Sequence, residues 1–197
     1  MLEKKIALLT SVTFNNIGNG FIDLGAEAAL MKALPLNAEL FKVSSNANFA
    51  ATMGQMFMLK ENPIINWLWY MQRAAKKLHD RSYKTVKTQN IFSMASMVKC
   101  DYFIIPGCVL TVPFFTIYGD LIKRKAEQGS KIIFLGASGN FYTEYEVKFV
   151  SEYLRKLQPY AIMTRDSLAY KYYANFTKNS YNGIDNVFFV NLLNLPQ

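Results

Sequence analysis

Four short stretches, each following an apolar run, hold the residues that could bind a ligand. The first is Asn15-Asn16-Ile17-Gly18-Asn19-Gly20, and Gly25 follows it. Glycines let backbone N–H groups approach a phosphate closely, and the N-terminus of a following helix favours negative charge. The spacing G-x-G-x4-G departs from the dinucleotide fingerprint G-x-G-x-x-G, which argues against NAD. A phosphate-binding turn and a plain strand-to-helix turn without a ligand both stay open.

The other three stretches are Pro106-Gly107-Cys108, residues 136–140 and residues 163–167. Arg165 in the last could form a bidentate pair with a phosphate or a carboxylate. An internal pair with Asp166 stays open as an alternative, as does a helix-capping role for Asp166 or Ser167. The candidate substrate-binding residues are Asn16, Gly18, Asn19, Gly107, Gly136, Ser138, Arg165 and Asp166.

The residue types present argue against several other kinds of chemistry. With His79 as the only histidine and Cys100 and Cys108 as the only cysteines, the chain is too poor in nitrogen and sulfur ligands for zinc. Ser138 directly precedes Gly139 and lies far from His79 in the sequence, which disfavours a nucleophile elbow and a Ser-His-acid triad. We therefore expect no metal and no bound cofactor, and we assign no catalytic residue.

Alternating strands and helices are predicted to position the candidate residues. The strand-like runs are nearly continuous in apolar residues, which is typical of parallel strands that are covered on both faces. They span residues 5–12, 39–43, 101–105, 131–135, 161–164 and 186–190. Helical patterns span residues 22–34, 116–128, 143–157 and 167–176.

This alternation predicts an α/β fold: one three-layer Rossmann-like domain over residues 1–197 with a mostly parallel sheet. In such a sheet, ligands bind beyond the carboxyl ends of the strands. The four polar or glycine-containing stretches therefore converge at one edge. Residues 44–62 interrupt the rhythm and are expected to form a loop or loose helix over one edge of the sheet.

Composition and charge bound the class of protein. The chain is 51% hydrophobic and 18% charged, which excludes disorder, and two cysteines exclude a disulfide scaffold. No stretch reaches the roughly 20 uninterrupted apolar residues that a spanning helix needs. We expect reduced, buried cysteines and a cytoplasmic protein.

The net charge is +8, and a basic stretch runs from Arg73 to Lys87. A solvated helix face is one interpretation of this stretch, and contact with an anionic ligand or membrane surface is another. No recognised nucleic-acid motif accompanies it, so we expect no nucleic-acid partner.

In their order, these stretches resemble the polysaccharide pyruvyl transferase family. The residues that carry the resemblance are NNIGNGFIDLGAEAAL, DYFIIPGCVLT, IIFLGASGNFYTEYEV, AIMTRDSLAYKYY and SYNGIDNVFFV. Asn19 stands where an Asp is common in the family, and Pro106-Gly107-Cys108 replaces a more glycine-rich turn. Residues 136–139 match a G-Q-x-x-G-like turn, and Arg165-Asp166-Ser167 matches an R-D-x-x-S-like motif.

The resemblance implies a two-domain protein of GT-B type, of which this chain would be the N-terminal, acceptor-side half. It implies transfer of a pyruvyl group from phosphoenolpyruvate, the donor substrate, to a sugar hydroxyl as a ketal in polysaccharide biosynthesis. The acceptor would be an anionic sugar phosphate or a lipid-linked glycan. In this family much of the catalytic wall comes from the second domain, so turnover is expected only when that domain completes the cleft.

Other interpretations of the sequence stay open. One is a non-catalytic module that docks through residues 73–87 on protein or, peripherally, on the inner face of the membrane. Another is one half of a nucleotide-sugar glycosyltransferase, which would share the fold. Assembly as a homo-oligomer is also open.

Overall fold

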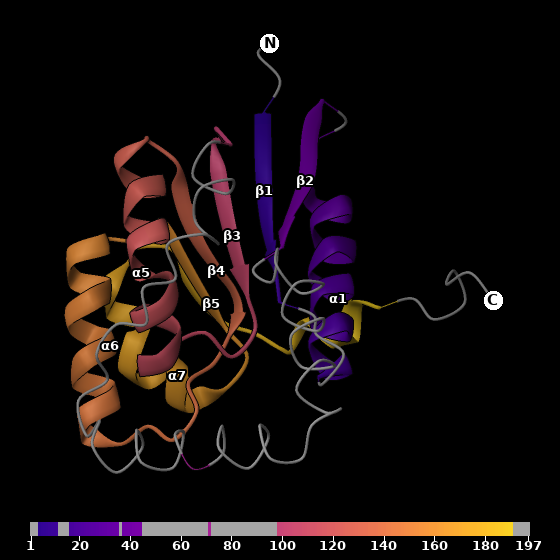
Figure 1. Cartoon of the computed structure of the whole chain (residues 1–197). Helices are drawn as coiled ribbons and strands as arrows, with labels where there is room; N and C mark the ends of the chain where they lie inside the picture. The colour runs from indigo at the N-terminus through magenta and orange to yellow at the C-terminus, as the bar shows by residue number, and fades with distance from the viewer. Residues whose placement is uncertain (1–3, 12–15, 36, 45–70, 72–97, 191–197) are drawn as a thin grey trace.

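The computed structural model describes residues 4–11, 16–35, 37–44, 71 and 98–190. These residues form a parallel sheet flanked by helices, which confirms the predicted α/β fold (Figure 1). The strands are β1 (Lys4–Thr10), β2 (Ala38–Ser44), β3 (Tyr102–Pro106), β4 (Lys131–Ala137), β5 (Ala161–Thr164) and β6 (Ser180–Asn182). The helices are α1 (Ile17–Ala33), α5 (Val112–Glu127), α6 (Glu144–Leu157) and α7 (Ser167–Tyr173), with the 3-10 helices η1 (Ala174–Phe176) and η2 (Asn186–Phe189).

The strand order is β2-β1-β3-β4-β5-β6, and every pairing of neighbours is parallel. Strand β1 lies between β2 and β3, so Leu8 is opposite Lys42 on one side and Ile104 on the other. The chain moves outward from β1 to β2 and then returns to continue the sheet from β3 on the other side. The crevice beyond the carboxyl ends of β1 and β3 is therefore the topological switch point, where open α/β sheets bind ligands.

Both faces of the central strands are buried. Along β1, Ala7 and Leu9 belong to the core under α5 and α6, whereas Ile6 and Leu8 belong to the core under α1. Because successive side chains of a strand point to opposite faces, a strand covered on both faces needs an uninterrupted apolar run. This accounts for the nearly continuous hydrophobic pattern of the sequence.

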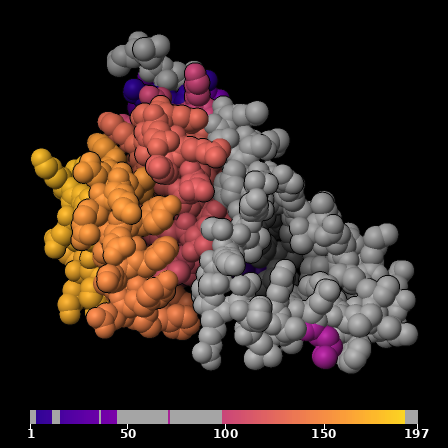
Figure 2. Space-filling model, turned by 60° about the vertical axis from the view of Figure 1, so that its left-hand side comes forward, coloured from indigo at the N-terminus to yellow at the C-terminus, as the bar shows by residue number. Residues whose placement is uncertain are grey.

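The helices lie in two layers. Helices α5, α6 and α7 cover one face, and α1 together with η2 lies on the other (Figure 1). Figure 2 shows α5 and α6 side by side at the surface of the first layer. No helix of the described residues is long and apolar enough to cross a membrane.

Local capping signals set the starts of three helices. Thr111 precedes α5 and accepts a hydrogen bond from the N–H of Phe114, and Thr143 does the same for Glu146 of α6. Asp166 caps α7 through the N–H of Ala169. Such caps satisfy N–H groups that have no partner within the helix. Helix α5 starts at Val112, four residues before the prediction, because Pro113 fits the first turn and Thr111 supplies the cap.

Helix α1 starts at Ile17 rather than at the predicted Ile22. Gly18 and Asn19 therefore lie in its first turn instead of in a loop before it. Two side chains of this helix bond to the backbone of Ser11: Asp23 Oδ2 accepts from its N–H at 2.8 Å, and Asn19 Nδ2 donates to its carbonyl at 3.2 Å. The start of the helix is thus fastened directly to the chain that leaves β1.

The prediction of a strand at residues 186–190 is wrong, because Asn186–Phe189 form the 3-10 helix η2. The reason is local side-chain bonding. Asp185 accepts from the N–H of Val187, which starts the turn, and Asn186 Nδ2 donates to the carbonyl of Leu135 at 3.0 Å. These bonds outweigh the β-propensity of Val187 and the aromatic residues that follow it. Within residues 98–190, the last strand is instead the three-residue β6, which the sequence pattern did not predict.

Candidate functional site

A pocket of about 340 Å³ lies at the topological switch point, between the ends of β1 and β3. Asn16 and Asn19 of the α1 start contribute amide groups, and Gly107 contributes the turn after β3. The remaining lining residues are Leu9, Ser11, Pro106, Cys108, Val109, Phe114 and Tyr118. Three of the eight predicted site residues are thus brought together in one pocket.

The start of α1 gives this pocket its polar character. Asn16 precedes the helix, and its side chain makes no capping hydrogen bond to the first turn. The first turn also carries no acidic residue. Helix N-termini have a partial positive charge and N–H groups without helical partners, so this end of the helix favours an anion. Gly18 lies exposed in the same turn, where a side chain would meet only Asn16 Oδ1 at 3.2 Å.

Asp23 was missed by the sequence analysis. Its carboxylate is 6% exposed and holds the backbone of Ser11 in the pocket wall. The only signal in the sequence that could have indicated its role is its position: it is an acidic residue directly after Ile22, among the apolar residues of α1 that face the sheet. Its partner Ser11 lies in the preceding strand exit, which the helical pattern does not reveal.

The turns after β3 and β4 are fastened to one another. Gly107 adopts φ +91, a left-handed conformation that favours glycine, and its carbonyl accepts from the N–H of Ser138 at 3.1 Å. The carbonyl of Ser138 in turn accepts from the N–H of Leu110 at 3.0 Å. The prediction that both cysteines are buried is wrong, because Cys108 is exposed in this turn and Cys100 is only partly buried. The thiol of Cys108 donates to the carbonyl of Gly139 at 3.2 Å. One wall of the pocket is therefore continuous with the next strand exit.

Arg165 is held by internal contacts rather than by Asp166. Its Nε donates to Ser138 Oγ at 3.0 Å, and its Nη1 forms an ion pair with Asp185. Asp166 fills the capping role that the sequence left open, since Oδ1 accepts from the N–H of Ala169 at 2.7 Å. Among the described residues, neither Arg165 nor Asp166 lines the pocket at the switch point. Arg165 and Asp166 instead make contacts within the protein that hold the turns after β4 and β5 in place.

Gly136 serves the packing of η2. It has φ +56, and a Cβ at this position would come 2.6 Å from the side-chain oxygen of Asn186. It lies in a separate, largely apolar pocket of about 570 Å³ on the α1 side of the sheet, together with Leu30, Met163 and Phe189. The predicted site residues therefore fall into two groups: those at the switch point and those that hold the exits of β4 and β5.

Tyr142 connects the exit turn of β4 to the start of α7. Its hydroxyl donates to the carboxylate of Asp166 at 2.8 Å and accepts from the N–H of Gly139 at 2.8 Å. Its backbone adopts φ 51, and the buried carboxylate of Glu146 accepts from its N–H at 2.8 Å. Burial raises the pKa of Tyr142 above its ordinary value, and the hydrogen bond to Asp166 adds to this rise. The N–H of Gly139, which donates to the hydroxyl, lowers the pKa and so offsets part of the rise.

Tyr173 lies beside this network and is fully buried. Its hydroxyl has no hydrogen-bond partner among the described residues. Burial raises the pKa of Tyr173, and the charge of Glu146 adds to the effect. Ionising either Tyr142 or Tyr173 in the folded protein would place a phenolate in a poorly solvated site next to a carboxylate.

The stability of the protein is expected to fall as the pH rises above 10.0, the ordinary pKa of tyrosine. In this range the unfolded chain releases protons from Tyr142 and Tyr173, whereas the folded chain retains them. The free energy of unfolding therefore decreases, by up to about 1.4 kcal/mol per pH unit for each tyrosine. The contribution is complete below pH 10.0 and is lost as the pH rises toward the folded-state pKa. Urea unfolding from about pH 8 to about pH 11 measures this slope.

Tyr142→Phe and Tyr173→Phe should each make the slope shallower. Tyr145→Phe is the matched control, because Tyr145 is 65% exposed and its replacement should leave the slope unchanged. An equal slope in all four proteins would contradict the assignment of the effect to the two buried tyrosines.

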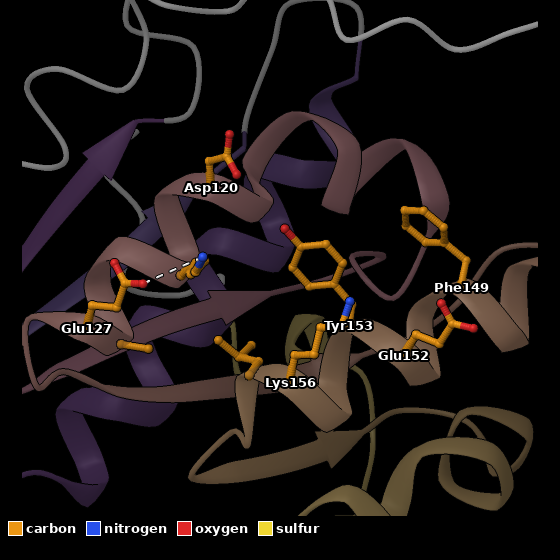
Figure 3. A pocket seen from close by; sticks show the side chains of 9 residues that line it. Asp120, Glu127, Phe149, Glu152, Tyr153 and Lys156 are labelled. Carbon is orange, nitrogen blue, oxygen red and sulfur yellow. Dashed lines mark ion pairs between the residues drawn. The ribbon is translucent and has the colours of Figure 1, made fainter.

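A further hollow of about 590 Å³ lies on the outer surface between α5 and α6 (Figure 3). Tyr153 reaches across it toward α5 and stacks on Phe115 with ring centroids 4.7 Å apart. Gly119 makes room for the Tyr153 hydroxyl, which a Cβ would meet at 2.0 Å. The rim carries exposed charges of both signs, including the pair of Lys123 and Glu127 at 3.7 Å. This hollow lies between helices, away from the strand exits, and does not contain any of the predicted site residues.

The basic stretch from Arg73 to Lys87 and His79 lie outside the described residues. Within the described part of the chain, no three His, Cys, Asp or Glu residues are grouped so that they could hold a metal ion. Comparison of the sequence and the structure with family models, curated proteins and solved structures finds no match.

Proposed function

We propose that this chain is the N-terminal, acceptor-side half of a polysaccharide pyruvyl transferase-like enzyme and that it binds an anionic sugar phosphate at the switch point. The observation that supports this most directly is the pocket formed by Asn16, Asn19 and Gly107 beyond the ends of β1 and β3. It lies where the strand order reverses, which is the usual ligand position in this class of sheet.

The pocket offers two kinds of contact to such a ligand. Its polar side has the amides of Asn16 and Asn19 and the N–H groups of the first turn of α1, which suit a phosphate. Its other side has the aromatic rings of Phe114 and Tyr118 from α5, which suit the face of a sugar or a base. An anionic head next to an apolar ring is the chemistry of a sugar phosphate or sugar nucleotide.

Transfer of the pyruvyl group would need a second domain that closes the cleft opposite this pocket. In the proposed reaction the two hydroxyl oxygens of the acceptor sugar become bonded to the central carbon of phosphoenolpyruvate. One hydroxyl proton goes to the methylene carbon, which becomes a methyl group, and the other leaves with inorganic phosphate as the bond between the central carbon and the phosphate oxygen breaks. The described residues provide a positioning surface for the acceptor. By the resemblance of the sequence, a second domain would supply the acid–base groups and exclude water from the cleft.

Calorimetric titration with UDP-glucose and, separately, with phosphoenolpyruvate tests the proposal. Asn19→Ala should weaken binding about tenfold, because it removes an amide from the site of the anion. Asn179→Ala is the matched control: Asn179 Nδ2 also donates to a backbone carbonyl, that of Tyr160, but at the amino end of β6. Its affinity should equal that of the wild type.

The outcomes separate the candidate functions. Binding of UDP-glucose that depends on Asn19, together with binding of phosphoenolpyruvate, supports the pyruvyl transferase assignment. Binding of UDP-glucose alone supports the acceptor site but fits both the pyruvyl transferase and half of a nucleotide-sugar glycosyltransferase, because a second domain would supply much of the donor site. If the wild type binds neither compound, or if Asn19→Ala and Asn179→Ala behave alike, the switch-point pocket is not the binding site.

A further inference from the structure

Helix α1 is apolar on two opposite sides. One side packs on the sheet through Ala26 and Leu30, which are 0% and 9% exposed. The opposite side carries Ile17, Phe21, Leu24 and Met31, which are 66%, 39%, 40% and 64% exposed. A helix of a monomeric domain normally has one apolar stripe and a polar outer face, whereas a helix that is apolar all round is buried on all sides. Among the described residues, the outer side of α1 is therefore an apolar surface that stays largely exposed.

The spacing of this outer stripe indicates what kind of partner fits. Ile17, Phe21, Leu24, Ala28 and Met31 are separated by four, three, four and three residues. This is the repeat by which two helices pack side by side along a continuous seam, with Phe21 and Ala28 at a positions and the other three at d positions. The seam runs about 21 Å along the helix. We call these five residues the α1 seam.

We propose that the α1 seam is a homodimer interface, in which the α1 helices of two copies pack in parallel. A second copy provides an identical seam, so the surface is complementary to itself, as a two-fold interface requires. Figure 1 shows α1 on the opposite face of the sheet from α5, α6 and α7.

The charges beside the α1 seam favour the parallel arrangement. Glu27 occupies a g position and Lys32 the e position five residues later, and in a parallel pair these residues face one another across the interface. The carboxylate of Glu27 already binds Lys42 of its own chain, at 3.0 Å and 3.1 Å from its two oxygens, and the partner's Lys32 would add a second cation. An antiparallel pair that overlaps the whole seam would instead bring Glu27 near the partner's Gly20, so the pair of Glu27 and Lys32 would not form.

Helix η2 enlarges the surface beyond the α1 seam. It packs beside α1 at Gly25 and carries Val187, Phe188 and Phe189, which are 37%, 73% and 37% exposed. Gly25 is at an e position, so in a parallel pair it faces the partner's Gly20, which has no side chain to obstruct η2. Exposed apolar side chains on two adjoining elements are typical of an interface, and a stable interface buries about 800 Å² on each partner.

Sedimentation of the full chain over a range of concentrations tests the proposal. The wild type is expected to form a dimer, and Leu24→Glu should raise its dissociation constant about 100-fold or more, because two unpaired carboxylates would enter the seam. Leu168→Glu is the matched control on α7, where the leucine is 47% exposed, and it should leave the dimer intact. Circular dichroism establishes that each variant is folded. A wild type that stays monomeric, or a dimer insensitive to Leu24→Glu, overturns the proposal.

Cysteine cross-linking tests the orientation. Ala28→Cys, made with Cys108→Ser to remove an exposed thiol, should form a disulfide-linked dimer under mild oxidation, because equal a positions meet in a parallel pair. Lys148→Cys in the same background is the control, since this exposed residue lies on α6 in the opposite layer. Glu27→Lys should weaken the dimer about tenfold, and adding Lys32→Glu should restore it. Failure of Ala28→Cys to cross-link above the control overturns the parallel arrangement.

Discussion

Replacing Gly25 by alanine is expected to lower the free energy of unfolding by about 3 kcal/mol, at the upper end of the range for overpacking. A Cβ at Gly25 would lie 1.9 Å from the carbonyl oxygen of Asn186 and 2.5 Å from its carbonyl carbon. These are backbone atoms, so no side-chain rotation relieves the contact. The η2 segment has to move away from α1, and the bond of Asn186 Nδ2 to the carbonyl of Leu135 is strained or lost.

Gly18→Ala is the matched control, because it makes the same change in the same helix. Its Cβ would meet only the side-chain oxygen of Asn16, at 3.2 Å, and that side chain can turn aside. Since alanine favours a helix over glycine by about 0.5–1 kcal/mol, this variant is expected to be slightly more stable than the wild type. Urea unfolding at one protein concentration measures both effects. Equal changes in the two variants would show that η2 does not pack tightly on α1.

Gly25 shows why part of this structure could not be predicted from sequence. Gly18, Gly20 and Gly25 form the pattern G-x-G-x4-G, which taken alone favours a phosphate-binding turn. In the structure, Gly25 lies in the middle of α1, where it makes room for Asn186 near the other end of the chain. A glycine that gives space to a distant segment has the same appearance in a sequence as one that binds a ligand. Only the fold distinguishes them.

Elements with local signals were predicted well. The apolar run at residues 131–135 falls within β4, and α6 follows Thr143, whose cap and following acids are visible in the sequence. Convergence of the turns after β3 and β4 on one edge also follows from a parallel sheet, and Ser138 and Gly107 do contact one another. The prediction failed at η2, because bonds from Asp185 and Asn186 decide its conformation.

Only part of the candidate site could be predicted, because some of its contacts follow from the sheet topology and others join segments that are distant in the sequence. The switch-point pocket contains Asn16, Asn19 and Gly107, because the topology of a parallel sheet brings the turns after its strands together independently of their side chains. Arg165 was expected to face a ligand, but Ser138 and Asp185 hold it, and Asp185 belongs to a segment whose path was predicted incorrectly. Asp23 and Tyr142 were missed, since their partners become neighbours only after folding.

Asp166→Ala is also expected to lower the free energy of unfolding by about 3 kcal/mol, through two separate bonds. The carboxylate caps α7 at the N–H of Ala169, 2.7 Å away, and loss of such a cap costs about 1 kcal/mol. It also accepts from the Tyr142 hydroxyl at 2.8–2.9 Å, and a hydrogen bond to a charged group contributes about 1.5–3 kcal/mol. Asp166→Asn keeps an acceptor of the same shape and should cost less.

A double-mutant cycle with Tyr142→Phe separates the two contributions. Once the hydroxyl is gone, Asp166→Ala should cost only the cap, so the two substitutions together should be less destabilising than the sum of their separate effects by about 1.5 kcal/mol. Simple additivity would mean that the hydroxyl and the carboxylate do not interact in solution. A coupling of the expected size has a consequence for the site, because the Tyr142 hydroxyl also accepts from the N–H of Gly139. Since the carbonyl of Gly139 accepts the thiol of Cys108 in the pocket wall, the cap of α7 would then help to hold the switch-point pocket in shape.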